Sequence, residues 1–196
     1  MGGTFDPIHY GHLVTAEEAL VQFNLDQVIF MPTGTPVRKT HRSVSAAEHR
    51  YLMTVIATAS NPDFEVSRLE VERPGPTYTV DTVTELGAKY GQSAELYFIT
   101  GADAVWDILG WKDADRLADL VTFIGATRPG YDLARFSEAR AAHERPPRVE
   151  LMEVPALAIS STDIRTRVAA HRPVRYLLPE AVAAYVLKHR LYEEGR

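Results

Sequence analysis

The sequence predicts an α/β fold, a doubly wound parallel sheet with helices on both faces. Segments with strand character alternate with segments of helical periodicity along the chain, and no internal repeat or low-complexity stretch interrupts them. With 196 residues, 45% of them hydrophobic, the chain can bury a substantial core. We therefore expect one domain over residues 1–196, with a small C-terminal helical part over 160–196.

The chain begins with the end of a strand that turns tightly into a helix. Gly2 and Gly3 permit a close approach of the backbone, and Asp6-Pro7 marks a turn. Apolar residues then recur at helical spacing and extend the helix to about residue 24; these are Leu13, Ala16, Leu20 and Phe23. A short apolar strand over 27–32 follows.

The next part of the chain is predicted as a loop, a helix and an extended segment. Residues 33–42 are polar and include several basic side chains. Ser45 and Glu48 have the spacing of a capping box, which predicts a helix from Ser45 to about residue 60. Alternation predicts an extended segment over 64–71, with a bulge where the phase changes near Ser67.

Helices and strands continue to alternate in the second half. The expected elements are a helix over 80–90 ended by Gly91, strands over 95–100, 120–126 and 148–154, helical segments split near Gly110-Trp111, and helices over 131–144, 160–171 and from 179 onward. Ligands of such sheets bind at the carboxyl ends of strands, where the strand order reverses. The loops at His9, Lys39, Gly101 and Ser160 are therefore expected to gather at one edge.

Composition excludes several classes of site. The formal net charge of −5 argues against a nucleic-acid-binding surface, although it leaves a local basic loop open. The chain has no cysteine, so disulfides and thiolate metal sites are not possible. No basic segment precedes an apolar run at the N-terminus, and no stretch of about 18 apolar residues occurs. We expect a cytoplasmic protein without a membrane partner.

Residues 2–12 have the pattern of a nucleotide site. A helix N-terminus presents unpaired N–H groups and the positive end of a dipole, which suit a phosphate. His9 and His12 lie at that point, and two imidazoles can donate hydrogen bonds to charge that grows in a transition state. The alternatives are an ordinary glycine turn and a pair of metal-binding histidines, although no zinc-type spacing accompanies the pair.

A second stretch, Ile159 to Arg165, has the pattern of a phosphate site. Its three consecutive hydroxyl residues, Ser160 to Thr162, can cap a helix and also bind phosphate oxygens. Arg165 lies one turn beyond Thr162 and can reach the same oxygens with a forked, charge-assisted bond. The alternative is an ordinary capped helix with Arg165 in solvent.

The two stretches resemble the signatures of the nucleotidylyltransferase superfamily, as His9-Tyr-Gly-His12 and Ile159-Ser-Ser-Thr-Asp-Ile-Arg165. Nearly the whole chain resembles the bacterial nicotinic acid mononucleotide adenylyltransferases, and the fold implied is Rossmann-like. The other segments that carry this resemblance are Gly75-Pro-Thr-Tyr-Thr-Val-Asp-Thr82, Thr100-Gly-Ala-Asp103 with Trp111, and Arg128-Pro-Gly130.

The resemblance implies the transfer of an adenylyl group from ATP to nicotinic acid mononucleotide in NAD biosynthesis. The products are nicotinic acid adenine dinucleotide and pyrophosphate, formed by direct in-line attack without a covalent enzyme intermediate. The implied catalytic residues are His9 and His12 at the α-phosphate, with Lys39 and Arg165 neutralising the triphosphate. Mg²⁺ is implied as a cofactor held through the phosphates, and the protein is implied to be a homodimer or higher homo-oligomer.

The resemblance also assigns binding residues. ATP is expected to contact Gly2, Gly3, Thr4, Phe5, His9, His12, Gly101, Asp103, Ile159, Ser160, Ser161, Thr162 and Arg165. Nicotinic acid mononucleotide is expected at Lys39, Tyr78, Thr79, Trp111 and Arg128, with the Trp111 ring stacked on the nicotinate. Trp106 is assigned to the core.

Two features depart from the family pattern. Arg38 stands where the family loop often has histidine. Family members have a strand directly before the Gly-Gly turn, and the sequence starts at Met1, so the N-terminal strand is expected to be truncated. Two rival functions remain: a related transferase such as the pantetheine-phosphate enzyme, and a non-catalytic nucleotide-binding protein. The choice between nicotinate and nicotinamide is not fixed by the sequence.

Overall fold

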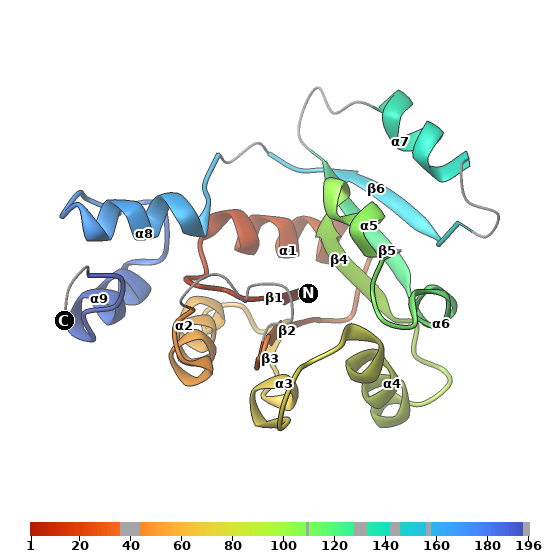
Figure 1. The fold of residues 1–196 in the computed structure, drawn as a ribbon, viewed down its shortest axis with the longest axis horizontal. Helices are drawn as coiled ribbons and strands as arrows, with labels where there is room; N and C mark the ends of the chain where they lie inside the picture. Colours follow the sequence, from red (N-terminus) through yellow and green to blue (C-terminus); the bar gives the residue numbers. More distant parts are fainter. Residues whose placement is uncertain (36–43, 109, 128–132, 142–145, 156–157, 194–196) are drawn as a thin grey trace. The chain divides into compact units, whose positions relative to one another are not determined.

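The computed structural model describes residues 1–35, 44–108, 110–127, 133–141, 146–155 and 158–193 (Figure 1). Its contacts divide the chain into two compact units. The first contains residues 1–2 and 78–156, and the second contains residues 3–77 and 157–196. Among the described residues, no helix is long and apolar enough to cross a membrane.

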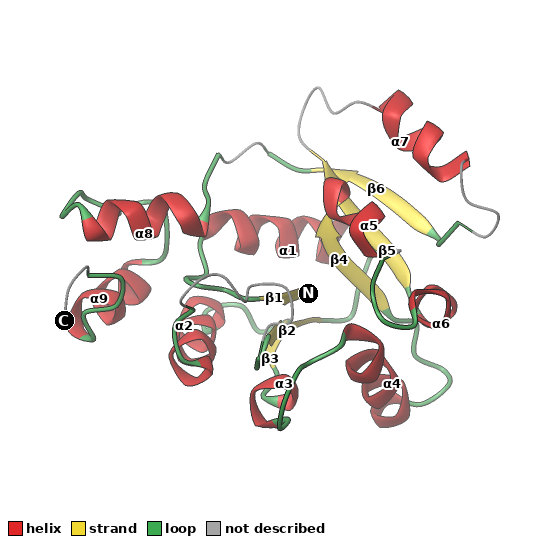
Figure 2. Ribbon diagram, viewed as in Figure 1, coloured by secondary structure: helices red, strands yellow, loops and turns green. Residues whose placement is uncertain are grey.

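The first unit contains a parallel sheet in the order β4-β5-β6 (Figure 2). Its strands are β4 (Tyr97–Gly101), β5 (Thr122–Thr127) and β6 (Val149–Glu153). Its helices are α4 (Thr79–Tyr90), α5 (Ala102–Ile108), α6 (Ala114–Leu120) and α7 (Leu133–Ala141). Helix α5 packs on β4 and β5, and α4 packs on α6. A positive φ of 82° at Gly91 ends α4, as the sequence predicts.

Apolar side chains from these elements form the core of the first unit. Phe123 in the central strand β5 is fully buried, because a strand with helices or strands around it exposes neither face. The buried members of this core are Val80, Val83, Val105, Ile108, Leu117, Val121, Phe123 and Val149. Tyr78 and Trp111 are partly buried and pack against it.

The other sheet has the order β1-β2-β3 and, apart from Gly2, belongs to the second unit. Its strands are β1 (Gly2–Gly3), β2 (Val28–Pro32) and β3 (Phe64–Val66). Strands β2 and β3 are parallel, with Val28 opposite Phe64. The helices are α1 (Tyr10–Gln22), α2 (Ala47–Thr58), α3 (Leu69–Glu72), α8 (Ser161–Ala169) and α9 (Glu180–Lys188). Helix α2 packs on both β2 and β3 and also on α9. The predicted α/β class, with parallel strands and a C-terminal helical part, is confirmed.

The predicted capping box at Ser45 is wrong. Helix α2 begins at Ala47, and its N-cap residue Ala46 offers no side chain to the helix. Ser45 instead uses its backbone: its N–H donates to Asp6 Oδ2 (3.4 Å), and its carbonyl accepts from Arg50 Nε (2.9 Å). Glu48, the other residue of the expected box, pairs with Arg68 at 2.9 Å. Tertiary partners have taken the groups that a local cap would use.

The predicted extended segment over 64–71 is correct only in its first part. Strand β3 ends at Val66, and α3 begins at Leu69. The Leu69 N–H donates to Ser67 Oγ (3.2 Å), so the hydroxyl stabilises a turn between strand and helix. The phase change near Ser67 therefore marks the end of the strand, and the predicted bulge is wrong.

Candidate active site

The turn between β1 and α1 is held through its carbonyl oxygens. The Gly3 carbonyl accepts from the Thr33 N–H (2.9 Å), and the Thr4 carbonyl accepts from Arg50 (2.9 Å). The Asp6 carbonyl accepts from Arg165, and the Pro7 carbonyl accepts from Ser161 Oγ (2.9 Å). The N–H of a trans peptide points away from its C=O. The amides of Thr4, Phe5 and Ile8 therefore face away from these donors, an arrangement that suits an anion on the other side.

His9 and His12 stack at the start of α1. Their ring centroids are 3.7 Å apart and the rings are inclined by 26°. The His9 backbone N–H donates to His12 Nδ1 (3.2 Å), so the neutral His12 ring carries its proton on Nε2. His9 is 6% exposed, and burial lowers its pKa from 6.5 to about 4. His9 is therefore neutral at physiological pH.

Gly11 allows this arrangement because the His9 ring lies close to its backbone. A Cβ at Gly11 would be 3.0 Å from both Cε1 and Nδ1 of His9, tighter than most contacts of a real Cβ. His9 Nδ1 is buried, and among the described residues it has no hydrogen-bond partner. A buried polar nitrogen left in this way is a candidate ligand contact.

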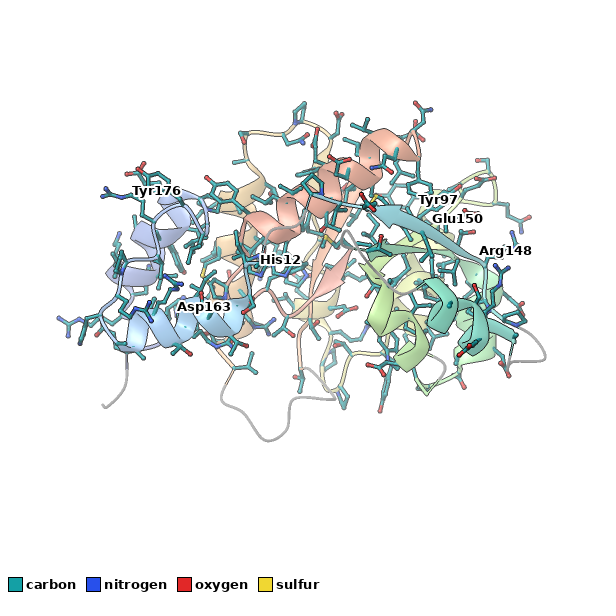
Figure 3. The ribbon with its side chains drawn as sticks, turned by 90° about the horizontal axis from the view of Figure 1, so that it is seen from above. His12, Tyr97, Arg148, Glu150, Asp163 and Tyr176 are labelled. Carbon is teal, nitrogen blue, oxygen red and sulfur yellow. The ribbon has the colours of Figure 1, made fainter. Side chains whose placement is uncertain are left out.

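The start of α8 lies against the same turn. Ser160 caps the helix by accepting from the Asp163 N–H (3.1 Å), and Ser161 Oγ binds the Pro7 carbonyl. Arg165 donates to Thr162 Oγ1 (3.0 Å) and to the Asp6 carbonyl, while its buried Nε has no hydrogen-bond partner in the described part of the chain. The first turns of α1 and α8, which carry the labelled His12 and Asp163, therefore lie side by side (Figure 3).

The second unit thus brings together most of the residues predicted to bind ATP. Gly3 to His12 and Ile159 to Arg165 form one cluster, in which Ser160 and Ser161 already use their hydroxyls inside the protein. The structure shows Arg165 half-buried and bonded to the protein, rather than in solvent. Lys39 and Arg38 lie outside the described residues.

Tyr78, Thr79 and Trp111, predicted to bind the mononucleotide, belong to the first unit. Tyr78 directly precedes α4 and Thr79 is its first residue. Lys112 Nζ lies 4.5 Å from the centroid of the Tyr78 ring and 3.5 Å from Asp81 Oδ2. The chain therefore places a cation beside the N-terminus of a twelve-residue helix.

Trp111 has two kinds of surroundings. Its ring meets Phe98 edge to face, with centroids 6.0 Å apart, and packs against the core of the first unit. It also lines an open cavity of about 610 Å³, together with Asp113, Ala114, Asp115 and Arg116. Trp111 is therefore both a core residue and a cavity wall, and the side chain of Trp106 lies outside the description.

The remaining predicted contacts are also in the first unit. Gly2 and Gly101 are exposed, and Gly101 ends β4 with open space where a Cβ would be. Asp103 lies in the first turn of α5, and its side chain is not described. Arg128 also lies outside the described residues.

Sequence reasoning missed Arg50. This arginine is 1% exposed and donates to the carbonyls of Thr4 (2.9 Å), Gly34 (2.8 Å) and Ser45 (2.9 Å). It thereby ties the nucleotide turn to α2. A signal was available, because Arg50 shares a helical face with the buried residues Met53, Thr54 and Ala57.

Comparison with known proteins first defines the class. Residues 1–167 match the family described as Cytidylyltransferase-like. The Plasmodium falciparum nicotinic acid mononucleotide adenylyltransferase complexed with NaAD has the same fold, with a TM-score of 0.79 at 20% identity over 97% of this chain and 94% of that chain. The matched family and the fold are those of a nucleotidyltransferase.

Closer relatives define the family. The chain is 57% identical over 192 residues to the probable nicotinate-nucleotide adenylyltransferase of Paenarthrobacter aurescens (strain TC1), covering 98% of this chain and 89% of that one. It is 55% identical over 194 residues to the probable nicotinate-nucleotide adenylyltransferase of Salinispora arenicola (strain CNS-205), and the match covers 99% of this chain and 100% of that one. The chain belongs to the nicotinate-nucleotide adenylyltransferases.

Proposed function

We propose that this protein transfers the adenylyl group of ATP to nicotinic acid mononucleotide. An oxygen of the mononucleotide 5′-phosphate attacks the α-phosphorus in line and forms a new P–O bond. The bond from the α-phosphorus to the bridging oxygen breaks, and pyrophosphate leaves with that oxygen. The relatives at 55–57% identity, which extend over nearly the whole chain, support this reaction.

The stacked His9–His12 pair between two helix N-termini is the observation that carries the proposal. A helix N-terminus stabilises phosphate oxygens, and the second unit places the N-termini of α1 and α8 side by side. His9 is neutral and His12 carries its proton on Nε2, so both rings serve as hydrogen-bond donors without a protonation step. Catalysis then consists of positioning and electrostatic stabilisation of the α-phosphate.

We assign the neutralisation of the negative charge of the triphosphate to cationic residues at the start of α8 and in the loop over 33–42. Arg165 supplies a fixed cation near His9, since it donates to the carbonyl of Asp6 in the same turn. Lys39 is proposed as the second cation of the triphosphate. The full proposed set for ATP is Gly2, Gly3, Thr4, Phe5, His9, His12, Gly101, Asp103, Ile159, Ser160, Ser161, Thr162 and Arg165.

We assign the mononucleotide to the residues around the start of α4. Trp111 offers an aromatic face and an open cavity of about 610 Å³, which suit the pyridine ring. The positive end of the α4 dipole and Lys112, which lies beside Tyr78 and also pairs with Asp81 of the first turn, favour an anion there. That charge pattern favours the carboxylate of nicotinate over the neutral amide of nicotinamide. Tyr78, Thr79, Trp111, Lys39 and Arg128 complete the proposed set.

The proposed cofactor is Mg²⁺. Among the described residues, no group of three or more His, Asp or Glu side chains could hold a metal ion. Asp6, the carboxylate of the nucleotide turn, is buried and bonded to Tyr192 Oη. Mg²⁺ would be held through the substrate phosphates and would offset the negative charge of the leaving pyrophosphate.

Pyrophosphate release with ATP and Mg²⁺ tests the proposal. Nicotinic acid mononucleotide, nicotinamide mononucleotide and phosphopantetheine are compared as acceptors, with a chelator as control. Turnover that is fastest with the nicotinic acid compound is expected. Turnover with phosphopantetheine alone would favour the related transferase, and ATP binding without pyrophosphate release from any acceptor would favour a non-catalytic protein. Light scattering under assay conditions tests the proposed homo-oligomer.

A further inference from the structure

A buried carboxylate lies inside the nucleotide turn without taking part in the proposed chemistry. Asp6 is 5% exposed. A buried carboxylate is costly unless donors satisfy it. The described structure gives Asp6 two: Tyr192 Oη, 2.6 Å from Oδ1, and the Ser45 N–H, 3.4 Å from Oδ2. The Tyr192 bond is the shorter, so Tyr192 is the main support of this carboxylate.

Tyr192 comes from the far end of the chain. It follows α9 through a backbone with positive φ at Arg190 (51°) and at Tyr192 itself (67°). Such conformations are unfavourable for residues with a Cβ, by roughly 1 kcal/mol or more each. The turn is nevertheless kept, with the Leu191 N–H bonded to the Val186 carbonyl (3.0 Å), and it directs the phenol at Asp6.

The carboxylate connects Tyr192 to the rest of the nucleotide turn. Ser45 donates to Asp6 through its N–H and accepts from Arg50 through its carbonyl. Arg50 in turn donates to the Thr4 carbonyl (2.9 Å), two residues before Asp6. A continuous hydrogen-bonded path therefore runs from Tyr192 through Asp6, Ser45 and Arg50 to Thr4, all within the second unit.

We propose that Tyr192 is a positioning residue for the adenylyl transfer, acting through Asp6 on the turn that presents His9 and His12. The inference rests on the proposed function, because it assigns the α-phosphate to that turn. Tyr192 touches no substrate in this scheme. Burial and the charge of Asp6 raise the pKa of the Tyr192 phenol, so the hydroxyl remains a donor over the working pH range.

Tyr192→Phe tests the proposal because it removes only the hydroxyl. Tyr185→Phe is the matched control: it also removes one hydroxyl, from α9, where the phenol bonds His49 Nδ1 (2.8 Å) and not the nucleotide turn. At a temperature where both variants are folded, we expect Tyr192→Phe to lower kcat/KM for ATP about tenfold, the effect of one hydrogen bond to a charged group. Tyr185→Phe should keep wild-type kinetics.

A double-mutant cycle with Asp6→Asn tests whether Tyr192 acts on the nucleotide turn through Asp6. If Tyr192 acts through Asp6, the kinetic effect of Tyr192→Phe should largely disappear in the Asp6→Asn background. Wild-type kinetics of Tyr192→Phe with only a lower melting temperature would overturn the proposal, and so would full additivity of the two substitutions. If the wild-type protein releases no pyrophosphate, the proposed function has failed, and ATP affinity of the same variants by calorimetry still decides the positioning role.

Discussion

At the scale of single residues, the two histidines of the nucleotide turn differ in their surroundings. His9 is buried and neutral, whereas His12 is half-buried with its Nδ1 occupied by a backbone N–H. The stacked rings, 3.7 Å apart, would repel each other if both were charged. The pair therefore suits hydrogen-bond donation to a phosphate better than general acid catalysis by an imidazolium.

His12→Ala should remove one of these donors. We expect kcat to fall by roughly 100-fold or more, the range for the loss of one donor to developing negative charge. The measurement is steady-state pyrophosphate release. His189→Ala, at an exposed histidine after α9, is the control and should retain wild-type turnover. Near-normal turnover of His12→Ala would exclude the proposed role.

The buried state of His9 predicts how stability depends on pH. Its pKa is about 4 in the folded protein against 6.5 in the unfolded chain, so only the unfolded state takes up a proton as the pH falls below about 6.5. The stabilisation is present above pH 6.5 and is lost towards pH 4. Between pH 7 and pH 5 this group should cost about 2 kcal/mol of unfolding free energy.

Urea unfolding of the wild type and of His9→Asn at the two pH values measures this loss. The variant lacks the titrating ring, so its stability should fall about 2 kcal/mol less than that of the wild type. Parallel pH dependence of the two proteins would mean that His9 is not neutral when folded. The other titrating groups are common to both proteins, so the contributions of those that do not contact His9 cancel in the comparison.

At the scale of elements, two glycines show that local helix propensity and tertiary packing affect stability at different positions. Gly87 lies inside α4, and among the described residues a Cβ there would meet only Leu96 Cδ1, at 4.0 Å. Gly34 follows β2, and a Cβ there would lie 2.0 Å from the Glu70 carbonyl oxygen. The first glycine lowers helix stability without a packing reason, and the second is required by a neighbouring backbone.

The same substitution should therefore have opposite effects at these positions. Gly87→Ala is expected to raise the unfolding free energy by about 0.5–1 kcal/mol, because alanine favours the helix and restricts the unfolded chain. Gly34→Ala must displace backbone and also disturbs the carbonyl that Arg50 binds, so a loss of about 2 kcal/mol or more is expected. Denaturant unfolding of both variants measures the difference, and equal effects would contradict it.

The comparison of elements shows what local patterns can predict. The helix stop at Gly91 and the strand at 95–100 depend on short-range preferences, and both are confirmed. The capping box at Ser45 failed because Asp6, 39 residues away, and Arg50 use the Ser45 backbone. A sequence pattern does not include such distant partners.

At the scale of the whole molecule, the family motifs predicted the class of protein and its fold, which are confirmed. They also named residues of the second unit that the structure brings together around the turn before α1. They could not find Arg50, Asp6 or Tyr192 as parts of that site. The roles of these three depend on burial and on a path between residues 6 and 192 that no local spacing encodes.

The charge of the molecule poses a further problem, since a chain with net charge −5 must bind two anionic substrates. Local cations and helix N-termini have to provide the attraction. Lys112, beside the start of α4, is the cation that we propose favours the nicotinate carboxylate. It is half-exposed, so its contribution is limited to about 1 kcal/mol by screening.

Lys112→Met should therefore change specificity more than turnover. We expect kcat/KM for nicotinic acid mononucleotide to fall about fivefold, as 1 kcal/mol implies, with little change for nicotinamide mononucleotide, which lacks the carboxylate. Lys89→Met is the matched control, because Lys89 lies over the Tyr90 ring (4.8 Å) at the opposite end of the same helix. Raising the ionic strength should likewise reduce the preference of the wild-type protein for nicotinic acid mononucleotide over nicotinamide mononucleotide. An equal loss for both mononucleotides would show that Lys112 supports the fold of the pocket rather than the choice of substrate.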